Sequence, residues 1–365
     1  MNNFIPIEYF NLVYYNFILL VVTIVFFQSL GSKLEDNNNT NGKNIFGFLL
    51  IVIIILYIGL RPLNYRFGDM VNYYKEFQRY ATGASNFSGK KDFVFECFKY
   101  VFAKFTNSTV FFFTCILLYI LPLYYACKKL FSNYWFYGFL MLVISFSFLA
   151  YGVNGIRNGI ATSLFIFAIS RKKWTTKIIL FLIMIFIHKS LLIPIVVYII
   201  VSKYSTTKYY LYGWLLAIPL SLTLGSFWEI FFLGLGFGDE KLDGYLGGIN
   251  QASEGVKLTI GFRWDFLLYS TTGIFASWYY IIKRKFNDST YILICNVYII
   301  ANAFWILVIR ASYSNRFAYL SWFLLGLVII YPLLKSKFSV NQHKMIGFIV
   351  ILYFSFTYLL NVILD

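Results

Sequence analysis

The chain has 365 residues, of which 60% are hydrophobic and only 13% are charged. Soluble domains are about 45–50% apolar and about 25% charged, so this composition excludes an ordinary soluble protein. The net charge of +16 comes from lysines in short clusters between apolar runs, which argues against a nucleic-acid-binding face. We therefore predict an all-α fold, a polytopic transmembrane helical bundle in which residues 1–365 form a single membrane domain.

Taken in chain order, the apolar runs predict the membrane segments. Between them lie two long polar intervals, 61–108 and 234–263. The first interval contains Phe93–Phe105, an apolar and aromatic stretch interrupted by charges, which predicts an amphipathic helix at the membrane interface. The candidate spans are 10–28, 45–60, 109–127, 134–152, 156–170, 178–201, 209–233, 264–282, 290–309, 316–334 and 345–363.

Short basic connectors orient these spans, because Lys and Arg concentrate in cytoplasmic loops. The connectors alternate in side as expected, except around 178–201, where a single span would put basic residues on both sides. We predict that the chain turns back near His188, so that 178–201 forms two arms of about 10–13 residues surrounded by protein or water. The bundle then has about 11–12 membrane segments, and the two long intervals become outer loops.

This topology places most of the arginines on the outer side, where they are not expected. Guanidinium is a planar fork of donors that suits phosphate, so several arginines in one cavity would fit a diphosphate. For any single arginine the alternative is a contact with lipid headgroups. Arg157 lies in Gly-Val-Asn-Gly-Ile-Arg-Asn-Gly, where the glycines allow close approach of a helix or a ligand. The candidates for anion binding are Arg61, Arg66, Arg157, Arg310 and Arg316.

Few residues could move a proton. His188 coincides with the predicted outer turn, and imidazole transfers protons near neutral pH, although a buried structural histidine is the alternative. Asp69 and Glu96 could each act as a base or simply pair with a cation. His343 lies in a basic connector and is expected to be solvated. The acidic residues of the second interval are also expected to be solvated, namely Asp239, Glu240, Asp243 and Glu254. No metal-ligand spacing and no nucleotide-binding motif occurs, so no metal or cofactor is expected.

Several short motifs, in order, carry a family resemblance. They are Gly59-Leu60-Arg61, Gly68-Asp69 with Tyr73 and Phe77, Glu96, Ile156-Arg157 with Ala161, Phe186-Ile187-His188-Lys189-Ser190, and Asn315-Arg316-Phe317-Ala318-Tyr319. This set, from about residue 45 to 335, resembles the EpsG branch of the Wzy-type polysaccharide polymerases. The chain departs from the family at Asn158, where glutamine is common.

The resemblance implies a bacterial enzyme of the plasma (inner) membrane. Such polymerases are metal-independent, inverting glycosyltransferases that join oligosaccharide repeat units carried on undecaprenyl diphosphate, at the outer face of the membrane. Their products are the O-antigen of lipopolysaccharide, capsule or exopolysaccharide. The implied partners are polyprenyl-diphosphate-linked oligosaccharides, membrane lipids and a chain-length regulator protein.

The predicted topology and the resemblance together suggest roles for particular residues. Catalysis is expected from Asp69, Glu96, Arg157 and His188, and substrate binding from Arg61, Arg66, Tyr73, Asn158, Arg310 and Arg316. Two other functions stay open. A flippase for the same lipid-linked oligosaccharide should show two related halves, and none is visible in the sequence. A membrane O-acyltransferase would place its histidine toward an acyl donor.

Overall fold

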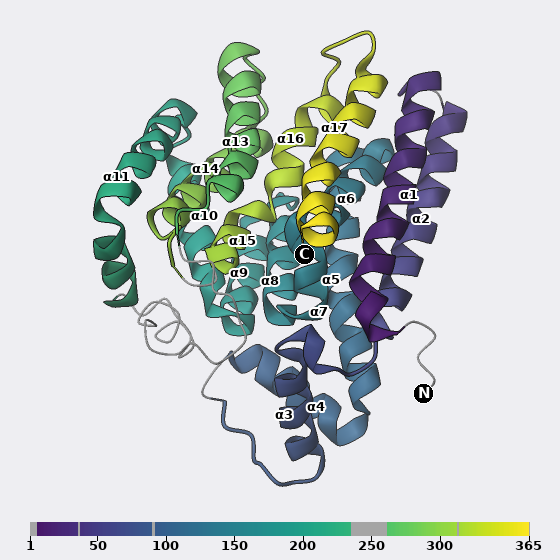
Figure 1. Cartoon of the computed structure of the whole chain (residues 1–365), viewed down its shortest axis with the longest axis vertical. Coiled ribbons are helices and arrows are strands. Elements are labelled where there is room, and N and C mark those ends of the chain that lie inside the picture. The colour runs from purple at the N-terminus through teal and green to yellow at the C-terminus, as the bar shows by residue number, and fades with distance from the viewer. Residues whose placement is uncertain (1–5, 36, 90–91, 235–260, 312–313, 365) are drawn as a thin grey trace. The chain divides into compact units, whose positions relative to one another are not determined.

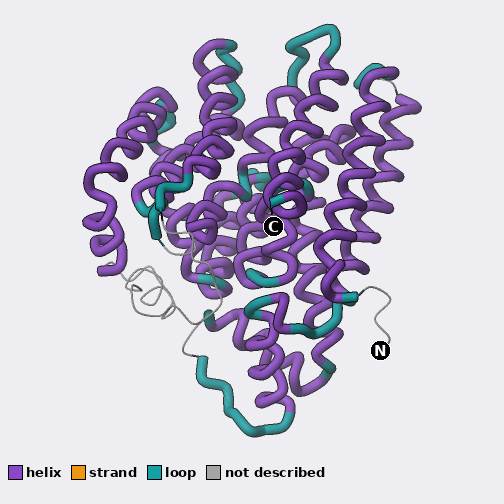
Figure 2. The backbone as a smooth tube through the Cα atoms, viewed as in Figure 1, coloured by secondary structure: helices purple, strands orange, loops and turns teal. Residues whose placement is uncertain are grey.

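In the computed structural model (Figure 1), the described residues are 6–35, 37–89, 92–234, 261–311 and 314–364. They form helices and loops, and this part of the chain contains no strand (Figure 2). A helix satisfies its own backbone hydrogen bonds, which is the requirement for a segment in lipid. The prediction of an all-α fold is therefore confirmed for the described residues.

Six helical stretches among the described residues are long and apolar enough to cross a membrane. They are Ile7–Gly31, Asn41–Gly59, Ser108–Val143, Ser289–Leu307, Ser314–Lys335 and Gln342–Ile363. Two shorter apolar helices, α8 (Ile156–Ile169) and α9 (Trp174–Ile187), accompany them. The chain is thus a polytopic helical membrane protein. The larger number of about 11–12 segments stays a prediction.

The helices divide into two compact units. Unit 1 comprises Met1–His188 with Leu333–Asp365, and unit 2 comprises Lys189–Pro332. Each unit has its own buried apolar core. The organisation of 1–365 as one membrane domain stays a prediction.

Unit 1 is built around α5, which packs on α2, α6 and α8, while α1 packs on α17. The start of α5 is defined by Asn107, whose side chain accepts a hydrogen bond from the Val110 N–H at 3.0 Å and so caps the helix. The predicted span 134–152 is divided between two shorter helices, α6 and α7. Besides α8 and α9, the helices of this unit are α1 (Phe10–Gly31), α2 (Asn37–Gly59), α3 (Met70–Ala81), α4 (Phe93–Phe105), α5 (Ser108–Phe131), α6 (Trp135–Val143), α7 (Phe146–Val153) and α17 (Gln342–Tyr358).

The polar interval 61–108 contains two helices that pack on each other. The predicted amphipathic helix is α4, with the expected bounds. The other helix, α3, is not predicted from the sequence. It buries Met70, Tyr73, Phe77 and Tyr80, whose spacing of three or four residues puts them on one face.

The chain breaks at His188, as predicted. Helix α9 ends at Ile187, His188 is extended with φ −159° and ψ 118°, and a short 3-10 turn (Lys189–Leu191) leads into α10 (Leu192–Lys203). Two helices of 14 and 12 residues therefore replace one long span. Because α9 belongs to unit 1 and α10 to unit 2, the reversal of the chain stays a prediction.

Unit 2 is held together by a buried polar centre. Asn302 donates to the Ser270 hydroxyl at 3.1 Å and to the Ser321 hydroxyl at 3.0 Å, and it accepts from the Trp214 indole at 2.8 Å. Hydrogen bonds of this kind join helices inside a membrane. The helices of this unit, besides α10, are α11 (Thr207–Gly234), α13 (Trp264–Ser277) with a π-helical end (Trp278–Lys283), α14 (Ser289–Leu307), α15 (Ser314–Trp322) and most of α16 (Leu325–Lys335). The predicted solvated residues Asp239, Glu240, Asp243 and Glu254 lie outside the described residues.

The prediction that His343 is solvated is wrong. Its exposed fraction is 4%, and its Nδ1 donates to the Ser32 carbonyl at 2.7 Å. Its Nε2 accepts from the Tyr137 hydroxyl at 2.5 Å and from Lys43 Nζ at 2.9 Å. The sequence assigns His343 to a basic connector, whereas α17 already begins at Gln342 and packs against α1. His343 is therefore part of a packed helix.

Candidate functional site

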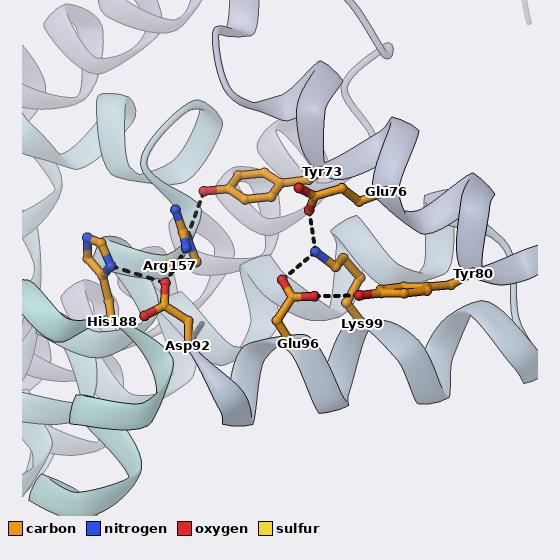
Figure 3. A network of polar contacts seen from close by, with 8 residues as sticks. All are labelled: Tyr73, Glu76, Tyr80, Asp92, Glu96, Lys99, Arg157 and His188. Atoms are coloured by element: carbon orange, nitrogen blue, oxygen red, sulfur yellow. Dashed lines mark hydrogen bonds and ion pairs between the residues drawn. The ribbon is translucent and has the colours of Figure 1, made fainter. Parts of the chain in front are cut away.

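Eight polar side chains of unit 1 form a network at the ends of α8 and α9 and along α3 and α4 (Figure 3). Four of them are connected around one carboxylate and are here named the Asp92 cluster: Asp92 itself, Arg157, His188 and Tyr73. The other four are connected around one amine and are named the Lys99 cluster: Lys99 itself, Glu76, Glu96 and Tyr80.

In the Asp92 cluster, a cation and an imidazole share one carboxylate oxygen. Arg157 Nη1 pairs with Asp92 Oδ2, and His188 Nδ1 lies 3.5 Å from the same oxygen. Arg157 Nε donates to the Tyr73 hydroxyl at 3.0 Å. The exposed fractions of the side chains are 2% for Asp92, 11% for His188 and 20% for Arg157. The carboxylate is therefore desolvated, which strengthens its attraction for both neighbours, while the guanidinium keeps some access.

Asp92 has an unusual backbone. Its φ of 42° and ψ of 55° are left-handed, a conformation that costs a non-glycine residue on the order of 1 kcal/mol or more. It directly precedes α4, where aspartate normally caps the helix, yet its side chain makes no capping hydrogen bond. The carboxylate is turned to Arg157 instead. A strained residue whose side chain gives up its usual local role is typical of a functional site.

Tyr73 holds the arginine from the other side. Its ring packs edge-on against Phe95 with centroids 5.6 Å apart, which fixes the hydroxyl that Arg157 contacts. Burial raises the pKa of the Tyr73 phenol to about 12, so the hydroxyl remains protonated at neutral pH. Arg157 thus has a neutral acceptor on one edge and an anion on another.

The Lys99 cluster fastens α3 to α4. Lys99 has an exposed fraction of 0% and pairs with Glu76 and, at 2.6 Å, with Glu96 Oε1. The Tyr80 hydroxyl donates to Glu96 Oε2 at 2.9 Å. Residues three, four or seven positions apart lie on one helix face, so the two rows from α3 and α4 meet side by side. A buried ammonium needs such partners. The pairing in turn positions Tyr73, which lies on α3, and Asp92, which directly precedes α4.

The Gly68-Asp69 pair fastens α3 to the start of α8. Gly68 has a φ of 58°, and a Cβ there would lie 2.5 Å from Asn154 Oδ1, so only glycine fits. The Asp69 N–H donates to the same oxygen at 2.9 Å. Asn154 lies three residues before Arg157, and this contact therefore aligns Tyr73 with the arginine.

The Asp92 cluster has the chemistry of anion binding and proton transfer. No three or more His, Cys, Asp or Glu side chains come together as a metal site in the described part of the chain. The cluster offers a guanidinium for phosphate oxygens and an imidazole for a proton.

A protein-family model for the EpsG family matches residues 44–365. This range includes every residue of both clusters. The chain belongs to the EpsG family. Membership indicates a polysaccharide-polymerase-like membrane protein, and it confirms the resemblance that the sequence motifs predict. Comparison with curated proteins and with solved structures finds no match.

Of the site residues expected for an EpsG-family protein, Arg157, His188 and Tyr73 come together in one cluster. Glu96 lies in the neighbouring cluster, paired with Lys99. Asn158 is half-buried in the first turn of α8. The carboxylate of Asp69 is half-buried at the start of α3, and its catalytic role stays a prediction.

Arg61 is placed differently from the expectation. Its exposed fraction is 6%, and its guanidinium donates to the Ile58 carbonyl at 2.6 Å and the Val153 carbonyl at 3.4 Å. Burial lowers the pKa of Arg61 to about 10, so it is still a cation at neutral pH. Its Nη1 and Nη2 groups are directed to the backbone at the ends of α2 and α7, where they join these helices. This placement does not support Arg61 as a ligand for substrate.

The other predicted arginines lie outside the clusters. Arg66 is exposed in the 3-10 turn Tyr65–Phe67. In unit 2, Arg310 is exposed and its Nη2 donates to the Leu222 carbonyl at 3.4 Å, and Arg316 is half-buried on α15. That Arg310 and Arg316 share a cavity with Arg157 stays a prediction.

Asp92 is the main residue that the sequence reasoning missed. An aspartate directly before an apolar helix is the usual signature of a helix cap, so the sequence pattern indicates a local structural role for Asp92. Its actual partners lie 65 residues away at Arg157 and farther still at His188. Nothing local in the sequence indicates these contacts.

Proposed function

We propose that this EpsG-family protein is a Wzy-type polymerase. It is an inverting glycosyltransferase that joins oligosaccharide repeat units carried on undecaprenyl diphosphate, at the outer face of the bacterial plasma (inner) membrane. Its product is O-antigen, capsule or exopolysaccharide. The observation that carries the proposal is the Asp92 cluster, where Arg157 and His188 share one buried carboxylate oxygen.

In this proposal, Arg157 binds the leaving diphosphate of the donor glycan. Its side chain is 20% exposed, so an anion can approach the guanidinium, whose planar fork matches two phosphate oxygens. Negative charge grows on the diphosphate as the glycosidic bond to it breaks, and a fixed cation lowers the energy of that transition state. Tyr73 keeps Arg157 in place through the Nε hydrogen bond, while the diphosphate competes with Asp92 for the Nη groups.

His188 takes the proton from the acceptor. Figure 3 shows its second ring nitrogen, Nε2, facing away from Asp92. The carboxylate beside Nδ1 favours the tautomer that leaves Nε2 free as a base, and it stabilises the imidazolium that forms. The separation of 3.5 Å is longer than a hydrogen bond, and such contacts commonly tighten when substrate binds.

The reaction is a single displacement. A hydroxyl oxygen of the acceptor sugar bonds to C1 of the donor sugar, the bond from C1 to the diphosphate oxygen breaks, and the hydroxyl proton passes to His188. The attack opposite the leaving group inverts C1. Asp69 is the alternative base in this proposal, Arg310 and Arg316 are additional diphosphate ligands, and membrane lipids and a chain-length regulator are partners.

The test uses the purified protein in lipid vesicles with one lipid-linked repeat unit as the sole substrate. Wild type should convert it to a ladder of longer lipid-linked glycans, and His188→Gln should not. In cells, deletion of the gene should leave surface glycan one repeat unit long. Complete loss of surface glycan would instead favour a flippase and refute the polymerase.

A further inference from the structure

A second site lies at the other end of α5. A cavity of about 660 Å³ is formed by the start of α2, the last turns of α5 and the start of α6. Helix α5 starts at Ser108, directly after α4, and the cavity is lined by Lys128. Twenty residues of helix are about 30 Å long, the thickness of the hydrocarbon core of a bilayer. The cavity, here named the Lys128 pocket, is therefore at the opposite membrane face from the Asp92 cluster.

The polar part of the pocket is positive. Lys128 is exposed, and its Nζ lies 3.4 Å from the Tyr124 hydroxyl. The described lining contains no acidic side chain. The first turn of α6 reaches the pocket at Trp135, and its cap residue, Tyr134, makes no side-chain capping bond. The partial positive charge of a helix N-terminus adds to that of the lysine.

One polar atom in the lining lacks a partner. Asn44 Oδ1 is buried and accepts no hydrogen bond from any described residue. A buried acceptor without a donor is costly, so the pocket suits a ligand that carries a hydroxyl or amine beside its anionic group.

The remaining wall is apolar and faces outward. Ile45, Phe48 and Leu49 line the pocket and have exposed fractions of 65%, 57% and 53%. Their spacing of three and four residues forms one stripe along α2, and exposed apolar side chains on a membrane helix lie against lipid chains. A ligand held here has an anionic head next to an apolar tail.

We propose that the Lys128 pocket binds an anionic phospholipid of the cytoplasmic leaflet. Lys128 holds the phosphate, a headgroup hydroxyl donates to Asn44 Oδ1, and one acyl chain follows the stripe on α2. The leaflet is assigned by the adjacent basic pair Lys128-Lys129, because basic pockets between helices on the cytoplasmic side recognise acidic headgroups. Phosphatidylglycerol has the matching phosphate and hydroxyls.

The test measures lipid binding to the full chain in detergent by native mass spectrometry, with phosphatidylglycerol, phosphatidylcholine and inorganic phosphate as probes. Wild type should bind phosphatidylglycerol more tightly than phosphatidylcholine, and inorganic phosphate should not displace it. Lys128→Gln should weaken binding about fivefold, the effect of one lysine near a membrane surface. Lys129→Gln, which removes the same charge one residue outside the lining, is the matched control and should bind as wild type does.

Asn44→Ala provides a second variant that does not change the charge. It should weaken the binding of phosphatidylglycerol. The binding of phosphatidic acid, which lacks the headgroup hydroxyls, should be unaffected. Equal binding of phosphatidylglycerol by wild type and Lys128→Gln would overturn the proposal, as would equal losses in the two lysine variants. Displacement by inorganic phosphate would show a site for a small anion and not for a lipid.

Discussion

Replacement of Arg157 by lysine separates a diphosphate ligand from an anchor at the membrane surface. Lysine keeps the charge but has one nitrogen, so Arg157→Lys loses the Nε hydrogen bond to Tyr73 and the bidentate fork. A hydrogen bond to a charged group contributes about 1.5–3 kcal/mol. If that contribution is made in the transition state, transfer should slow roughly tenfold to a hundredfold. An anchoring arginine would be replaced without loss, because lysine reaches the headgroups equally well.

The assay is the initial rate of glycan elongation in vesicles that hold equal amounts of protein. Arg79→Lys is the matched control, since Arg79 is exposed on α3 and lies outside both clusters. Tyr73→Phe removes only the acceptor of the Nε hydrogen bond and should reproduce part of the loss. A wild-type rate from Arg157→Lys at normal protein level would refute the reasoning.

Three further predictions follow from the same geometry. Asp92→Asn keeps the shape but removes the charge beside both Arg157 and the imidazole, and the elongation rate should fall roughly tenfold or more; a wild-type rate would contradict this. Lys99→Met leaves two carboxylates without their cation, so the protein should lose about 3 kcal/mol of stability, visible as a lower melting temperature in detergent, and an unchanged melting temperature would contradict it. Single cysteines at Lys173 and Lys203, in a background without the native cysteines, should both resist an impermeant thiol reagent in intact cells, and labelling of one alone would show that the chain does not turn back.

The helices could be predicted wherever local composition alone determines the secondary structure. Charges that interrupt an aromatic run predict α4 with its observed bounds, and basic residues on both sides of 178–201 predict the break at His188. In both places the signal is local, because the surrounding solvent or lipid selects the structure. The helix α3 is missed because its mean composition is polar, and its buried face is defined by its contacts with α4 and α5.

The site could be predicted only in part, for a related reason. Arg157 and His188 stand out because arginine and histidine are unusual in their surroundings. Asp92 does not stand out, because aspartate is common directly before a helix. Arg61 also stands out, yet its donors join two helix ends. One sequence shows which residues are unusual for their surroundings, but partners far apart along the chain are set by tertiary packing.

The buried His343 has a consequence for how the protein is made. It links α17 to Ser32 directly after α1, to Lys43 on α2 and to Tyr137 on α6. Unit 1 therefore contains segments from both ends of the sequence. The ribosome delivers the Asp92 cluster early and then all of unit 2 before α17 emerges. Until α17 is inserted, the face of α1 that packs on α17 lies in the membrane without that contact. Interactions with the insertion machinery should therefore persist for α1 until α17 arrives, even though the residues proposed for catalysis are already in the bilayer.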